Sequence, residues 1–66
     1  MSYSEKRKAA AKEALGSYDF MLREFIYHEG VEHPMVDIFK DNRKTIISAL
    51  LGEGYLKGKD VKDFGV

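Results

Sequence analysis

The sequence predicts a small all-α domain with a long first helix, a short second helix and a third helix, followed by a short irregular or hairpin-like tail. Two observations predict it. Apolar residues recur at spacings of three and four, first from Ala11 to Ile26 and again from Ile46 to Leu51, as they do along one face of a helix. Residues that end or begin helices delimit these segments: Gly30 and Gly52 suit helix ends, and Pro34 suits a helix start. With 66 residues, the chain is expected to form one domain.

The first helix is expected to begin at Ser4, a good N-cap, and to continue through an alanine-rich segment. Gly16 and Ser17 fall inside the apolar pattern and mark a kink or a division. We therefore expect a basic helical arm over residues 1–16 and a helical core over residues 17–54, with Gly30 ending the first helix. Residues 55–66 are expected to form the tail.

Pro34 suits the first turn of a second helix, and an apolar cluster follows it up to Phe39. The five polar residues 40–44, KDNRK, then exceed one helical turn. A continuous helix over residues 34–51 would place Asn42 or Arg43 in its own apolar seam. The sequence therefore favours two helices over one continuous helix. In this interpretation Asp41 or Asn42 caps the third helix.

The tail after Gly52 and Gly54 has no helical period. Gly58 lies between two lysines and suits a turn. Four apolar side chains are expected to dock this segment on the helices: Tyr55, Leu56, Val61 and Phe64.

This order of elements, and the segment from Arg43 to Gly58 with its sequence EGYLKG, resembles a winged helix-turn-helix DNA-binding domain over about residues 18–62. The resemblance implies that a recognition helix enters the major groove and that a wing follows it. It assigns DNA contacts to Asn42, Arg43, Lys44, Thr45 and Ser48, and phosphate contacts on the wing to Lys57 and Lys59. Arg43 and Lys44 are both expected to be exposed.

A second interpretation is that KDNRK is a solvated surface and that the glycines only end a helix. The aromatic residues then carry more information, because a core of two or three helices is too small to bury all of them. The surplus predicts a protein interface, used by a homodimer or by a partner protein, that contains Phe20, Met21, Tyr27 and Tyr55. Acidic residues from Asp19 to Asp37 favour a basic partner surface.

Several other classes are disfavoured. The chain has no cysteine and no apolar run long enough to cross a bilayer, and its first residues lack the apolar core of a signal peptide. His28 and His33 are five residues apart with a glycine between them, which does not fit the helical zinc motif. We find no catalytic motif and expect no enzyme activity, metal, cofactor or small-molecule substrate. A cytoplasmic protein that does not bind membranes is expected.

The sequence thus predicts a small non-enzymatic DNA-binding regulator, expected to be a homodimer. The alternative is a small helical adaptor or inhibitor, comparable to phage or plasmid accessory factors, that binds a partner protein through its aromatic surface. The net charge of zero does not favour a strong nonspecific polyanion binder.

Overall fold

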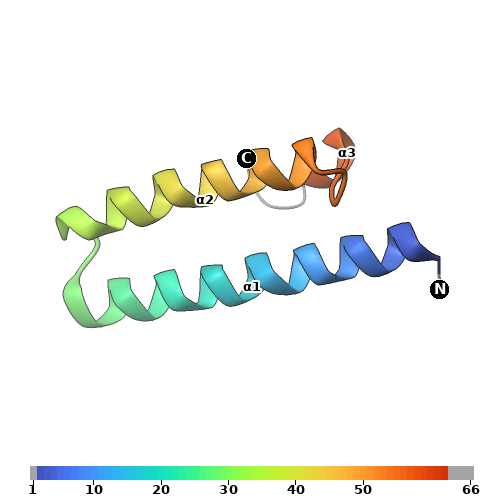
Figure 1. Ribbon diagram of the computed structural model, residues 1–66. Coiled ribbons are helices and arrows are strands. Elements are labelled where there is room, and N and C mark those ends of the chain that lie inside the picture. Colours follow the sequence, from blue (N-terminus) through green and yellow to red (C-terminus); the bar gives the residue numbers. More distant parts are fainter. Residues whose placement is uncertain (1, 63–66) are drawn as a thin grey trace.

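The computed structural model describes residues 2–62, which form an antiparallel hairpin of two long helices (Figure 1). Helix α1 spans Tyr3–Glu29 and helix α2 spans Pro34–Gly52. A one-turn helix, α3, spans Gly58–Val61 and lies beside the end of α2, near the start of α1. No strand occurs between residues 2 and 62. The all-α prediction is confirmed.

Helix α1 is continuous, so the division predicted at Gly16 is wrong. The helix also begins earlier than expected, because Ser2 rather than Ser4 is its N-cap. The Ser2 hydroxyl accepts a hydrogen bond from the Glu5 N–H at 3.2 Å, and the Glu5 carboxylate accepts one from the Ser2 N–H at 3.2 Å. This capping box satisfies two backbone donors and anchors the first turn.

The turn between the helices contains Gly30, whose φ of +91° is a conformation that glycine adopts without steric cost. Its N–H donates to the Ile26 carbonyl at 2.8 Å and closes α1. His33 then caps α2, with its Nδ1 atom accepting from the Met35 N–H at 3.1 Å. Pro34 occupies the first turn, as predicted.

Helix α2 is also continuous, and the break predicted around Asp41 and Asn42 is wrong. The polar residue that the seam had to accommodate is Arg43, whose side chain is only 15% exposed. It is accommodated because its guanidinium binds the carboxylate of Asp19 on α1, at 2.6 Å and 3.2 Å. The short second and third helices predicted from the sequence are therefore one helix.

The hairpin has two unlike halves, which we call the open half (residues 2–16 and 45–62) and the loop half (residues 17–44). In the open half, Leu56 folds back onto the two helices and completes a buried cluster with Ala11, Leu15 and Ile47. In the loop half only α1 and α2 are available. Two buried side chains, Leu22 and Val36, are joined there by half-buried aromatic rings.

The tail is neither a hairpin nor a wing within residues 55–62. The carbonyl of Leu50 accepts from the N–H groups of Tyr55 and Leu56, at 2.9 Å and 3.3 Å, which turns the chain back after α2. Gly58, expected in a turn, is the first residue of α3. The expected docking of Tyr55, Leu56 and Val61 is present, whereas Phe64 lies outside the described residues.

Continuity of α2 can be tested with Asn42→Pro. Proline would suit the first turn of a helix capped by Asp41, but in the interior of α2 it should cost about 3 kcal/mol or more. We expect urea denaturation to show this loss relative to Asn42→Ala, which leaves the backbone N–H in place. Equal stability of the two variants would contradict a continuous α2.

Candidate functional site

Arg43 connects the two helices and is not available as a surface group. Its Nε donates to Asp19 Oδ1 and one terminal nitrogen donates to Oδ2, the two-pronged geometry in which guanidinium and carboxylate match. Beside it, the Tyr18 hydroxyl donates to the Phe39 carbonyl at 2.8 Å. The expectation that Arg43 is exposed is wrong.

The other predicted DNA-contacting residues of α2 are exposed but do not share one face. Asn42 and Lys44 are two positions apart, about 200° around the helix, so they point to opposite sides. Lys44, Thr45 and Ser48 do share a side. All of them lie in the middle of α2 and none at a helix N-terminus, because no turn precedes them.

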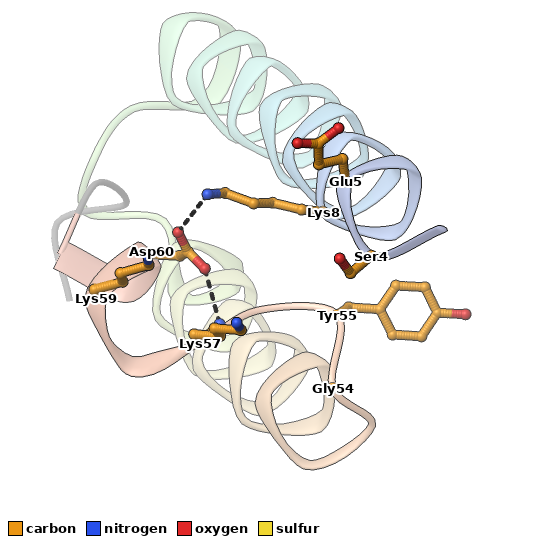
Figure 2. A pocket seen from close by; sticks show the side chains of 8 residues that line it. All are labelled: Ser4, Glu5, Lys8, Gly54, Tyr55, Lys57, Lys59 and Asp60. Atoms are coloured by element: carbon orange, nitrogen blue, oxygen red, sulfur yellow. Dashed lines mark hydrogen bonds and ion pairs between the residues drawn. The ribbon is translucent and has the colours of Figure 1, made fainter. Parts of the chain in front are cut away.

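Lys57 and Lys59 lie at the open end of the hairpin, where Figure 2 shows them beside Asp60. They help to line a hollow of about 260 Å³ between the first turns of α1 and the tail. Ser4, Glu5 and Lys8 line it from α1, and Gly54, Tyr55 and Asp60 from the tail. Both charge signs are present, so the hollow has no single-sign field for an ionic ligand.

Asp60 is the buried charge of this end. Its carboxylate is 2.9 Å from the Lys8 ammonium and also accepts from the Lys57 N–H at 2.9 Å (Figure 2). The hydrogen bond from Lys8, and next that from the Lys57 backbone, hold the pKa of Asp60 below its ordinary value of 3.8, although burial opposes this. The contacts join α3 to α1.

Tyr55, predicted as an interface residue, has a structural role. The guanidinium of Arg7 lies 4.2 Å from the centre of the Tyr55 ring and 5.4 Å from that of Tyr3. The same guanidinium donates to the Glu53 carbonyl at 2.6 Å. Arg7 therefore ties the start of α1 to the end of α2, and Tyr55 is half-buried against it.

The remaining predicted interface residues are exposed. Phe20, Met21 and Tyr27 are 58%, 41% and 82% exposed. Three further large apolar side chains of the loop half are exposed, and the sequence analysis did not select them: Val31, Met35 and Ile38. Among residues 2–62, Tyr3 is the one exposed large apolar side chain outside this half. The exposed apolar side chains thus lie mostly in the half of the hairpin that no third element of the described residues covers.

Phe20 and Tyr27 form what we call the outer face of α1. They are seven residues apart, two turns of the helix, and therefore lie on one side. Leu15 and Leu22, which are buried against α2, lie on the opposite side of α1. The two exposed rings consequently point away from α2.

The histidines do not form a metal site. His33 caps α2, and its ring packs edge to face on Phe25 with centroids 5.1 Å apart. His28 lies 3.7 Å from the carboxylate of Glu24 on the surface. Within residues 2–62 no three histidine, cysteine, aspartate or glutamate side chains could hold an ion together. None of the helices in this range has both the length and the apolar character needed to cross a membrane.

Comparison of the chain with known protein families, with curated proteins and with solved structures finds no match. The surface must be interpreted from its own geometry. Sequence reasoning missed the contacts made by Arg7, Lys8 and Asp60, because residues 46 to 52 positions apart are joined only once the hairpin has formed. It also missed the ion pair of Arg43, a residue that it expected to be exposed.

The role of Arg43 can be tested with two variants. Arg43→Glu would set two carboxylates side by side at a half-buried position and should cost roughly 2 kcal/mol. Arg43→Met keeps the apolar stem and leaves Asp19 free to turn to water, so it should cost less than about 1 kcal/mol. Urea denaturation measures both. A stable Arg43→Glu variant would show that Arg43 is a surface residue.

The Asp60 contacts predict a dependence on pH. Because the folded-state pKa is lowered, the contribution to stability is complete well above pH 3.8 and is lost as the pH falls through the lowered pKa. Asp60→Asn should therefore melt at a lower temperature than the parent at neutral pH, and the difference should shrink toward about pH 2. Glu13→Gln, at an exposed position, is the control. A difference that does not change with pH would refute the ionic role.

Proposed function

We propose that this chain is a non-enzymatic protein-binding module of the adaptor or inhibitor class, which binds its partner through the outer face of α1. The observation that carries the proposal is the pair Phe20 and Tyr27. They present two aromatic rings to solvent on the side of α1 that α2 cannot reach. Neither ring contributes to the core, so the fold itself does not account for their exposure.

Aromatic side chains at this spacing suit recognition by a groove. Residues two turns apart on one helix are the anchors that helix-in-groove complexes use. Phenylalanine and tyrosine bring large apolar area with few rotatable bonds, so little side-chain entropy is lost when they bind. Because Tyr27 is 82% exposed, its hydroxyl can also reach a polar group at the rim of such a groove.

The charges around these rings favour a basic partner surface. Residues 17–37 contain five acidic side chains and one basic one, Arg23. Glu24 lies between the two rings along α1, and Glu29 and Glu32 follow toward the turn. Such a rim increases the rate of encounter with a basic surface and disfavours polyanions. The expected partner therefore has an apolar groove edged by lysine or arginine.

DNA binding is supported less well by the same structure. The hypothesis used Arg43 as a base-contacting residue, and its guanidinium is held by Asp19. Lys44, Thr45 and Ser48 remain exposed on one side of α2, so phosphate contacts through that side stay a prediction. The acidic loop half gives no field that would attract a duplex.

The proposal can be tested by photo-cross-linking in the cells that make the protein. The photoreactive residue p-benzoylphenylalanine is placed at Tyr27 or, as the matched control, at Ser48, which is exposed on α2. We expect a discrete protein adduct from position 27 and none from position 48. Phe20→Ser in the same chain should weaken the adduct severalfold without lowering the melting temperature, because the Phe20 ring is outside the core.

Two outcomes would contradict the proposal. One is the absence of a discrete adduct from position 27, or equal adducts from both positions. The other is salt-dependent binding of a labelled duplex that Lys44→Glu abolishes and Phe20→Ser leaves unchanged, which would favour the DNA-binding regulator.

A further inference from the structure

The two sides of the hairpin that run along the α1–α2 seam differ in chemistry. We call one side the apolar flank. On α1 it contains Ala10, Ala14, Ser17, Met21 and Phe25, and on α2 it contains Met35, Phe39, Asn42, Ile46 and Ala49. These residues follow one another at spacings of three and four on each helix, which keeps them on one side. The Phe25 and Phe39 rings, 5.1 Å apart, show that the two series meet on the same side of the seam.

From Ala10 to Phe25 on α1 and from Met35 to Ala49 on α2, the apolar flank contains no charged side chain. Arg7 continues the α1 series before Ala10, and its guanidinium packs on the Tyr55 ring. The opposite side, which we call the charged flank, has Lys8, Lys12, Asp19 and Arg23 at the corresponding positions of α1. Helix α3 packs on the charged flank, since its Asp60 binds Lys8. Figure 2 shows Lys8 and Asp60 together on the side away from the Tyr55 ring. No element within residues 2–62 forms a third layer on the apolar flank, and Met21 and Met35 are 41% and 37% exposed on it.

We propose that the apolar flank binds the same flank of a second copy of this chain, and that the two hairpins form an antiparallel four-helix bundle. The series at spacings of three and four is the pattern by which helices interlock in such bundles. The apolar flank consists of one such series on α1 and one on α2. When a two-fold axis relates two copies, each series can pack against a series of the other copy, so the flank can bind itself. The outer face of α1 remains exposed in this arrangement, so the inference does not depend on the proposed function.

The distribution of charge favours the antiparallel orientation. The loop half, residues 17–44, contains six acidic and four basic side chains, and the open half contains four acidic and seven basic ones. The halves therefore carry −2 and +3. Two hairpins packed with their loops at opposite ends place each acidic half against the basic half of the other copy, whereas a parallel pair would place like charges together.

The size of the hairpin suits such an interface. A stable interface of ordinary size takes about 800 Å² from each partner, roughly a sixth of the 4887 Å² that the chain exposes. The hairpin measures 41 × 19 × 16 Å, so one flank along its length can supply an area of that order.

Two polar residues of the apolar flank fall near its middle. Ser17 and Asn42 lie where the two-fold axis of an antiparallel pair would pass, so each would meet its counterpart or the other residue in the second copy. A lone asparagine in an apolar seam specifies register and orientation, because other registers would leave its amide unpaired. In the single hairpin Asn42 is exposed, so its proposed role is in the dimer.

The test begins with the mass in solution by analytical ultracentrifugation of the full chain. The parent protein should sediment at about 15 kDa, twice its 7.5 kDa. Met21→Glu should halve this mass, because each interface would then bury an unpaired carboxylate on both copies. Phe20→Glu is the matched control: it is the adjacent residue, is more exposed and lies outside the apolar flank, so its dimer should persist. Circular dichroism should show unchanged helix content in both.

Orientation is tested with single cysteines, for which the chain offers a cysteine-free background. On α2, position 49 of one copy should lie near position 35 of the other, because both are equally far from Asn42, whereas like positions should be about 20 Å apart along the axis. A mixture of Ala49→Cys and Met35→Cys proteins should therefore oxidise to the mixed dimer. A parent that stays monomeric, an unchanged mass for Met21→Glu, or preferential 49–49 and 35–35 products would each overturn the proposal.

Discussion

The structure depends on one constraint, which is that two helices share a single seam. Each helix buries one stripe against the other and leaves the rest of its circumference to solvent or to another element. The chain meets this limit differently at its two ends. In the open half, Leu56 and α3 add a third contact and complete the buried cluster around Leu15 and Ile47. In the loop half no further element of residues 2–62 is added, and six large apolar side chains remain exposed there.

Polar contacts fix how the two helices meet. The Asp19–Arg43 pair near the middle and the Tyr18 hydroxyl on the Phe39 carbonyl set the register of α2 against α1. Arg7 and Asp60 then fasten the end of the chain to the start of α1. Each of these polar contacts adds little to the net free energy of folding. We infer that their main effect is to disfavour other alignments of α2 along α1, which would leave the same groups unpaired.

The helical class, the turn at Gly30 and Pro34, and the surplus of exposed aromatic rings could be predicted from periodicity and composition, because these are local properties. The continuity of α2 could not. The periodicity indicates only that a continuous helix would bring Asn42 or Arg43 into the seam, and the choice between a break and a buried pair depended on Asp19, 24 positions before Arg43. Ser2 was missed as the N-cap because Ser4 offered the same chemistry two residues later. Of the predicted interface residues, Tyr55 could not be recognised as structural until Arg7 was placed beside it.

The dimer and the partner protein that we propose use different surfaces of the hairpin, so both can bind at once. Helix α3 occupies part of the charged flank, and the proposed second copy would cover the apolar flank. The outer face of α1, with Phe20 and Tyr27, is then left for a different protein. An antiparallel dimer would carry two such faces at opposite ends of one rigid bundle. A partner with two grooves at matching separation would be bound more tightly than either contact alone allows, because the second contact becomes intramolecular. Dimerisation would thereby increase the affinity of the proposed module as well as complete its core.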